Sequence, residues 1–195
     1  GMGSDPRIGG SFLYAGLGYG GSCFPKDINA LIATQKKLGI EEGILIKTKE
    51  VNERQVEFFS NKILHSLEGP LDEKILTIWG LSFKPNSDDI REAVSLKLIK
   101  RVAKHVNQLK LYDPLANEFV KEELKEIKNL RFFEDKYDAL VDSSGLIICT
   151  EWKEFWDPDL TKFKNMLSKT IFDGRNILNR SRIEKAGITY FGIGI

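Results

Sequence analysis

The stretch Lys74-Ile75-Leu76-Thr77-Ile78-Trp79 decides the fold of this chain. Its β-branched and aromatic residues predict a strand, and the Gly69-Pro70 pair just before it is a strong break. From this strand onward, short apolar runs alternate with amphipathic segments at helical spacing. Such alternation predicts a parallel sheet that is covered by helices on both faces. The fold class is therefore α/β.

Further strands are predicted at residues 108–112, 131–133, 146–150, 170–172 and 189–191. Helices are predicted between them, at residues 90–104, 116–127, 136–141, 160–167 and 180–185. Asp89 and Glu92 predict a capping box at the start of the first of these helices. The whole region, residues 69–195, is predicted to form one domain with Rossmann-like architecture.

Residues 1–68 are predicted to be a separate, helical part of the chain. Ile28 and Leu31 belong to the apolar stripe of a helix over residues 26–38, and a longer helix is predicted over residues 42–67. A helix of about 25 residues is about 38 Å long, too long for one small core to cover. Its surplus surface either packs on another subunit or another domain, or simply covers the neighbouring helix.

A glycine-rich turn, Gly16-Leu17-Gly18-Tyr19-Gly20-Gly21-Ser22, leads into the first of these helices and ends at Cys23. Glycines let a ligand approach the backbone, and Pro25 suits the first helical position. Cys23 is therefore expected at the positive end of a helix dipole, which favours a thiolate nucleophile. Asp27 follows one helical turn later, where a carboxylate can activate water. A lone cysteine is more often a small buried hydrophobe, and Cys149, in an apolar strand, keeps that interpretation.

Polar side chains follow several of the predicted strands directly. They are Lys84, Asp113, Glu151 and Arg175. Because the carboxyl ends of parallel strands share one edge of the sheet, where such sheets bind ligands, we expect these side chains to lie there. The two cations, Lys84 and Arg175, next to Gly174 and a helix start, predict a diphosphate site. The turn at Gly80 does not carry the Gly-x-Gly-x-x-Gly fingerprint of NAD binding.

Composition excludes several classes of protein. The 195 residues include 29 Lys plus Arg and 28 Asp plus Glu, a net charge of +1, and a nucleic-acid partner would need a clear basic excess. No apolar stretch approaches the roughly 20 residues of a membrane span. Two cysteines make no disulfide framework, so a cytoplasmic location is expected. His65 and His105 are far apart and lack partners at ligand spacing, so no metal site is predicted.

Residues 18–27 (GYGGSCFPKD) resemble the active-site segment of the UDP-glucose 6-dehydrogenases, in the UDP-glucose/GDP-mannose dehydrogenase family. Further blocks match the same enzymes, in the family's order and over nearly the whole chain. They are residues 5–9 (DPRIG), 83–92 (FKPNSDDIRE), 112–114 (YDP), 149–152 (CTEW) and 172–175 (FDGR). Several blocks in order are strong evidence, whereas one alone would be weak.

The resemblance implies a reaction and the residues for it. In the family, NAD takes hydride twice from C6 of UDP-glucose, and UDP-glucuronate forms through a cysteine thioester. The match puts the nucleophile at Cys23 and water activation at Asp27, and it assigns Lys26 and Arg91 to the phosphates of NAD. It implies that the UDP-sugar is contacted by Arg7, Phe12, Tyr14, Gly20, Phe83, Lys84 and Arg175. Arg7 matches an arginine that reaches the substrate of a neighbouring subunit, which implies a homodimer.

Family members also carry an N-terminal NAD-binding domain and a catalytic lysine and asparagine, which this sequence does not show. The resemblance therefore implies the C-terminal part of such an enzyme, inactive by itself because the main NAD site is absent. Two alternatives stay open. One is a stand-alone UDP-sugar-binding module in which Cys23 is a relic. The other is a dehydrogenase of another nucleotide sugar, such as UDP-N-acetylmannosamine or GDP-mannose.

Overall fold

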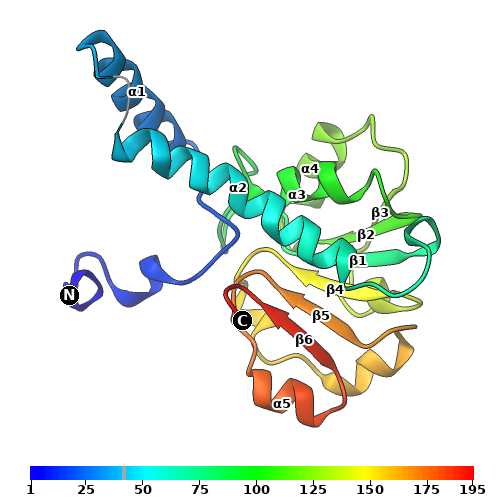
Figure 1. Cartoon of the computed structure of the whole chain (residues 1–195). Helices are drawn as coiled ribbons and strands as arrows, with labels where there is room; N and C mark the ends of the chain where they lie inside the picture. Colours follow the sequence, from blue (N-terminus) through cyan, green and yellow to red (C-terminus); the bar gives the residue numbers. More distant parts are fainter. Residues whose placement is uncertain (41–42) are drawn as a thin grey trace.

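The chain begins with an extended arm and two helices. The structure, a computed structural model, describes residues 1–40 and 43–195, without the side chains of Ser11 and Phe12. The arm contains two short 3₁₀ turns, η1 (Met2–Ser4) and η2 (Gly10–Leu13). Helices α1 (Phe24–Lys37) and α2 (Ile44–His65) follow. The arm and α1 stand away from the sheet, which α2 reaches with its C-terminal half (Figure 1).

The rest of the chain is built on one parallel sheet. Its strands are β1 (Ile75–Trp79), β2 (Gln108–Tyr112), β3 (Leu130–Phe132), β4 (Gly145–Ile148), β5 (Thr170–Asp173) and β6 (Thr189–Gly192). The strand order is β3-β2-β1-β4-β5-β6, and every pairing is parallel. This is the doubly wound order of a Rossmann-like sheet. The predicted α/β fold class is confirmed.

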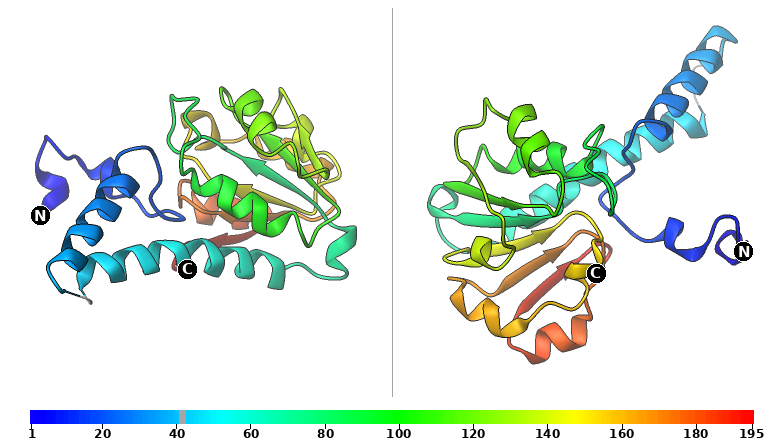
Figure 2. Two further views of the ribbon diagram at one scale, coloured as in Figure 1. Left: turned by 90° about the horizontal axis from the view of Figure 1, so that it is seen from above. Right: turned by 180° about the vertical axis from the view of Figure 1, so that it is seen from behind.

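Successive side chains of a strand point to opposite faces of the sheet. Apolar side chains therefore emerge on both faces, and helices and turns cover each of them. On the face of Ile78 lie α2, α3 (Val94–Val102) and α4 (Asn117–Glu123). The face of Trp79 is covered by other elements. They are η4 (Asp138–Leu140), η5 (Lys153–Phe155), η6 (Leu160–Asn165) and α5 (Arg180–Lys185). Figure 2 shows the sheet with these layers from above and from behind.

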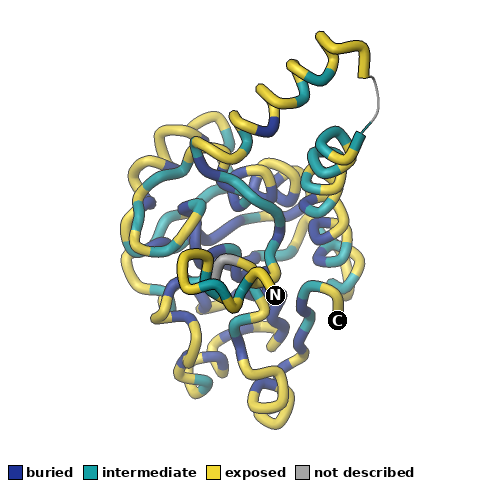
Figure 3. The backbone as a smooth tube through the Cα atoms, turned by 90° about the vertical axis from the view of Figure 1, so that its left-hand side faces the viewer, coloured by how far each residue is buried: buried dark blue, intermediate teal, exposed yellow. Residues whose placement is uncertain are grey.

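Helix α2 divides into two halves with different surroundings. Its C-terminal half packs on the sheet through Val56, Phe59 and Ile63, which recur at helical spacing. Its N-terminal half leaves the sheet and runs beside α1. The tube in Figure 3 is mostly yellow and teal over α1 and the start of α2, which marks exposed and half-buried residues. An apolar stripe at Ile44, Val51 and Phe58 is exposed along α2, and it extends from the N-terminal into the C-terminal half.

Helix α3 begins later than its sequence pattern indicates. Its first residue is Val94 and its N-cap is Ala93, so the predicted capping box of Asp89 and Glu92 is wrong. The Asp89 carboxylate instead accepts hydrogen bonds from the backbone N–H and the guanidinium of Arg91. Glu92 has a φ of 52°, a left-handed conformation that does not belong to a helix start.

Other differences concern the length of helices. The predicted helices at residues 136–141 and 160–167 are only the turns η4 and η6, and α4 ends at Glu123. Helix α1 already begins at Phe24, so Pro25 takes the second helical position. None of the helices within residues 1–40 and 43–195 has both the length and the apolar character that crossing a membrane requires.

Candidate active site

Cys23 lies at the N-terminus of α1, as predicted. It takes the N-cap position and is exposed. Its carbonyl accepts the first hydrogen bond of the helix from the N–H of Asp27, at 2.9 Å, and the Oγ of Ser22 lies 3.7 Å from its Sγ. The first N–H groups of a helix have no partner within the helix and carry partial positive charge. Cys23 therefore lies at the positive end of the helix dipole.

The turn before Cys23 lies against the loop that connects β1 to α3. The N–H of Gly21 donates to the carbonyl of Arg91 at 3.0 Å. Gly21 has a φ of 84°, and a Cβ on it would lie only 2.8 Å from the ring of Phe83. Gly20 approaches the same loop, since a Cβ there would lie 2.3 Å from the Glu92 carbonyl oxygen. The turn can lie this close to the loop because these residues have no side chain.

The two cations predicted for NAD lie near Cys23 and are exposed. Lys26 follows in the first turn of α1, with its Nζ 3.6 Å from a carboxylate oxygen of Asp27. Arg91 pairs with Asp89, Nη2 to Oδ2 at 2.6 Å. The Arg91 guanidinium holds the pKa of the Asp89 carboxyl below its usual range. Asp27 is exposed one turn beyond Cys23, on the same side of the helix.

The polar residues expected at one sheet edge do follow the carboxyl ends of neighbouring parallel strands. Lys84 is exposed, and its Nζ lies 5.3 Å from the centroid of the Phe83 ring. Arg175 is half-buried, with its Nε 2.9 Å from Oε2 of Glu151. That pair lacks hydrogen-bond geometry, so the buried Nε has no hydrogen-bond partner among the described residues. The expected helix start beside these cations is wrong, since α3 begins at Val94 and α5 at Arg180.

Asp113 is buried at the end of β2 and binds the turn after β1. Its Oδ2 accepts hydrogen bonds from the N–H of Leu81 (2.6 Å), the N–H of Ser82 (3.1 Å) and the indole Nε1–H of Trp152 (3.2 Å). In a dinucleotide-binding sheet, the turn after the first strand receives the diphosphate. Here an internal carboxylate holds its N–H groups. This turn therefore does not fit NAD, whereas the exposed Lys26 and Arg91 remain able to meet phosphates.

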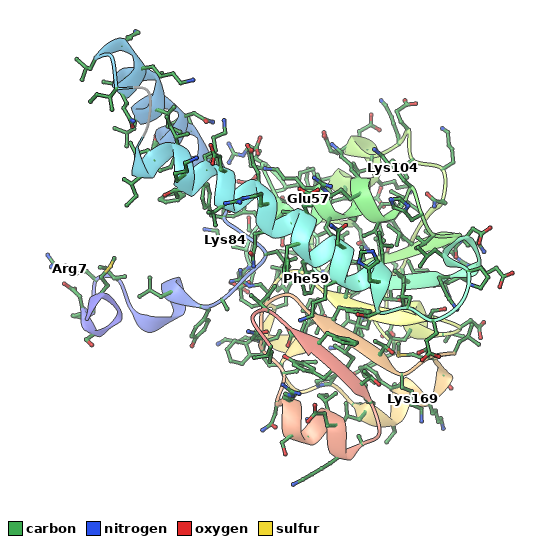
Figure 4. The ribbon with its side chains drawn as sticks, in the orientation of Figure 1. Arg7, Glu57, Phe59, Lys84, Lys104 and Lys169 are labelled. Carbon is green, nitrogen blue, oxygen red and sulfur yellow. The ribbon has the colours of Figure 1, made fainter. Side chains whose placement is uncertain are left out.

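The arm carries the remaining predicted site residues, Arg7, Phe12 and Tyr14. Figure 4 shows Arg7 on the arm, far from Lys84 at the sheet edge. Arg7 is exposed and pairs with Asp5 at 2.7 Å. Tyr14 is exposed, with its ring 6.4 Å from that of Trp156. The side chain of Phe12 lies outside the described part of the chain. Within the described part of one chain, Arg7 and Lys84 therefore lie apart.

Cys149 has the environment of a packing residue. It follows β4, is half-buried and packs against the main core. Burial raises the pKa of its thiol to about 12, so the group is not ionised at neutral pH. The structure supports the prediction that the second cysteine is a small apolar residue rather than a nucleophile.

The contacts of two residues of this site, Asp113 and Asn52, could not be predicted from the sequence. Asp113 was expected at the sheet edge, but nothing in the sequence shows that its carboxylate would bind the β1 turn. Asn52, in the middle of α2, binds the backbone of Tyr19 through two hydrogen bonds. A polar residue on a helix gives no sequence signal for such a contact, since solvent exposure is its usual state.

Comparison with known proteins gives the same order of parts. Residues 1–54 match the central domain of the UDP-glucose/GDP-mannose dehydrogenase family, and residues 77–180 match the UDP binding domain of that family. A UDP-glucose 6-dehydrogenase of Pseudomonas aeruginosa is 39% identical over 100% of this chain. The UDP-glucose 6-dehydrogenase TuaD of Bacillus subtilis is 36% identical, also over 100%. The chain spans 44% and 42% of the length of these two relatives.

A solved structure shares the fold as well. The UDP-glucose dehydrogenase of the archaeon Pyrobaculum islandicum superposes with a TM-score of 0.79 at 32% identity, over 98% of this chain and 41% of its own. The fold therefore defines an α/β protein with a Rossmann-like sheet. The chain belongs to the UDP-glucose/GDP-mannose dehydrogenase family.

Proposed function

We propose that this chain carries the catalytic cysteine and the UDP-binding site of an NAD-dependent UDP-glucose 6-dehydrogenase. The observation that carries the proposal is the position of Cys23. It is exposed at the N-terminus of α1, in a turn that is hydrogen-bonded to the loop between β1 and α3, which bears Lys84. The nucleophile and a nucleotide-binding cation thus lie on two segments in direct contact. The names of the relatives above favour UDP-glucose among the nucleotide sugars.

Each residue has a defined part in the proposed reaction. Lys84 and Arg175 bind the diphosphate of the substrate as cations, with Phe83 and Gly20 beside the sugar and uridine. NAD, when bound with its phosphates at Lys26 and Arg91, supplies the hydride acceptor. Loss of one hydride from C6 to NAD would give the sugar aldehyde, to which the thiolate of Cys23 would add to form a thiohemiacetal. Loss of a second hydride from C6, to a second NAD, would convert this thiohemiacetal to the thioester, and the two hydroxyl protons would pass to solvent.

Asp27 acts in the last step of this reaction. Its carboxylate accepts a proton from the water that attacks the thioester carbonyl. The C–S bond breaks, UDP-glucuronate leaves and the sulfur of Cys23 is free again. The position of Asp27 one turn after Cys23 supports this role.

The assembly and the division into parts belong to the same proposal. Residues 1–68 are part of a central helical domain, and residues 69–195 form the UDP-sugar-binding domain. The functional protein is a cytoplasmic homodimer. Two observations support the homodimer: the exposed apolar stripe of α2, and an arm that holds Arg7 away from its own sheet. In a dimer, the arm can serve the site of the partner.

Calorimetric titration tests the nucleotide site. We expect weak binding of UDP and UDP-glucose and little or none of NAD, because Asp113 already occupies the β1 turn. Lys84→Ala and Arg175→Ala each remove a charge-assisted contact and should weaken UDP binding by about tenfold. Lys169→Ala is the matched control, since this exposed lysine lies toward the opposite end of the strands (Figure 4). Tight NAD binding, or equal loss in Lys169→Ala, contradicts the site.

The cysteine is tested without any redox step, because a thiol adds to an aldehyde unaided. The 6-aldehyde of UDP-glucose should protect Cys23 from iodoacetamide by forming a thiohemiacetal, whereas UDP-glucose at saturation should protect it less. The experiment is done in the Cys149→Ala variant, so that Cys23 is the one cysteine of the chain that can be alkylated. UDP binding without additional protection by the aldehyde would favour the alternative, a UDP-sugar-binding module in which Cys23 does no chemistry.

A further inference from the structure

Asn52 holds the turn that precedes Cys23 from the side of α2. Its Oδ1 accepts a hydrogen bond from the N–H of Tyr19 at 2.7 Å, and its Nδ2 donates to the carbonyl of the same residue at 3.2 Å. A side-chain amide offers one acceptor and two donors, so it can pair with both groups of one backbone unit. Asn52 is half-buried and lies in α2.

We propose that Asn52 is a positioning residue for Cys23: it holds the Gly18–Gly21 turn against the β1–α3 loop and thereby keeps the nucleophile in register with the UDP site. This inference rests on the proposed function, because it assigns to Asn52 the placement of a nucleophile. Asn52 does not itself contact the reacting atoms.

The fit between Asn52 and the turn is close and specific. Gly18 has a φ of 130°, and a Cβ on it would lie 2.5 Å from Oδ1 of Asn52. Glycine at this position therefore serves two purposes, since it permits the left-handed backbone and leaves room for the amide. The two sides of the contact, Gly18 and Asn52, are matched to one another.

On its other side, the Gly18–Gly21 turn contacts the β1–α3 loop. The N–H of Gly21 binds the carbonyl of Arg91, and Gly20 packs on the carbonyl of Glu92. The hydrogen bond from Gly21 to Arg91 thus fixes the turn, and with it Cys23 two residues later, to the loop that bears Lys84. Without the hydrogen bonds of Asn52, the turn is held only by its contacts with the β1–α3 loop. Cys23 then loses its fixed distance from Arg91 and from the loop of Lys84.

The test compares Asn52→Ala with Asn61→Ala, in which an exposed asparagine of the same helix is changed. Amide hydrogen exchange at Tyr19 should become at least tenfold faster in Asn52→Ala alone. Iodoacetamide should alkylate its Cys23 at least threefold more slowly at pH 7, because the turn no longer holds the sulfur in place beside the β1–α3 loop. Cys23 is already exposed, so a looser turn cannot slow the reaction through access. UDP affinity should stay within twofold, since Lys84 and Arg175 do not touch Asn52.

Two further variants separate positioning from a general loss of structure. Asn52→Asp keeps the acceptor for the N–H of Tyr19 but sets a carboxylate against its carbonyl, so its alkylation rate should lie between those of wild type and Asn52→Ala. Gly18→Ala should slow alkylation through the same contact. The double variant should therefore be no slower than the slower single variant.

The outcomes distinguish this inference from the proposed function. Wild-type exchange and alkylation rates in Asn52→Ala would overturn the positioning role, even where the aldehyde still protects Cys23. If the aldehyde fails to protect Cys23 in the wild type, the proposed function falls, and with it the assignment of Asn52 to a nucleophile. Additive effects of Gly18→Ala and Asn52→Ala would show that the two residues act through separate contacts, against the proposal.

Discussion

At the scale of single residues, the two cysteines occupy opposite environments. Cys23 is exposed at a helix N-terminus, whereas Cys149 is half-buried at the end of a strand and packs against the core. Burial raises the pKa of Cys149 to about 12 because the apolar surroundings disfavour the thiolate. Since the thiolate is the reactive form of cysteine, these surroundings decide which sulfur can act.

Alkylation of the folded chain checks this difference. At pH 7 to 9, iodoacetamide should modify Cys23 and leave Cys149 unmodified, as located by peptide mass spectrometry. In denaturant both cysteines should react at similar rates, because unfolding removes the burial of Cys149. Cys23→Ser should leave a folded protein with almost no reactive thiol. Rapid modification of Cys149 in the folded Cys23→Ser variant would show that its surroundings are not those described.

At the scale of elements, α2 connects the arm and α1 to the sheet. One side of its C-terminal half is part of the core, while the opposite side stays exposed. Phe59 is 0% exposed and Phe58 is 60% exposed, although they are neighbours with the same side chain. A helix turns about 100° per residue, so successive residues face different surroundings. The pair offers a matched comparison within one element.

Replacing each phenylalanine separately should give very different effects. Phe59→Ala removes a fully buried ring and leaves a cavity, and it should lower the free energy of unfolding by about 3–5 kcal/mol. Phe58→Ala should change it by less than about 0.5 kcal/mol in the monomer. Urea denaturation followed by circular dichroism measures both values. A large loss for Phe58→Ala that grows with protein concentration would indicate that this side is buried in the homodimer.

At the scale of the whole molecule, several weak acids are buried or half-buried in their un-ionised form. Burial raises the pKa of Cys149, and it also raises the pKa of Tyr112 and Tyr190 well above the usual range for tyrosine. Tyr190 donates its hydroxyl to the buried carboxylate of Asp173 at 3.0 Å, whose charge adds to the shift. In the unfolded chain these groups ionise at lower pH than in the folded chain.

Stability should therefore fall in alkaline solution. The folded pKa values are raised, so the stabilising contribution of these groups is complete below about pH 8.5, the ordinary pKa of cysteine. It is lost progressively as the pH rises toward 12. The urea midpoint should fall between pH 8 and pH 11. Tyr190→Phe should lose less over this interval than wild type, despite a lower midpoint at neutral pH, and Tyr14→Phe, at an exposed site, should behave as wild type.

Much of this molecule could be read from the order of its residues. Alternating apolar runs predicted the parallel sheet, because a strand buried on both faces needs a continuous apolar segment. The same order placed Cys23 at a helix start and the polar residues at the ends of strands. Helix lengths were predicted less well. The true start of α3 depends on an Asp89–Arg91 contact and on the left-handed conformation of Glu92. Neither feature produces a periodic pattern of apolar residues from which it could be predicted.

The sequence by itself determined the fold class, the order of strands along the chain and the place of Cys23 at the start of a helix, because periodicity and local spacing are properties of the linear chain. Only the tertiary structure decided which groups meet. Asp113 binds the turn after β1, and Asn52 binds the turn before Cys23. Each contact joins residues some thirty positions apart, at positions set by helix and sheet packing that no local pattern encodes.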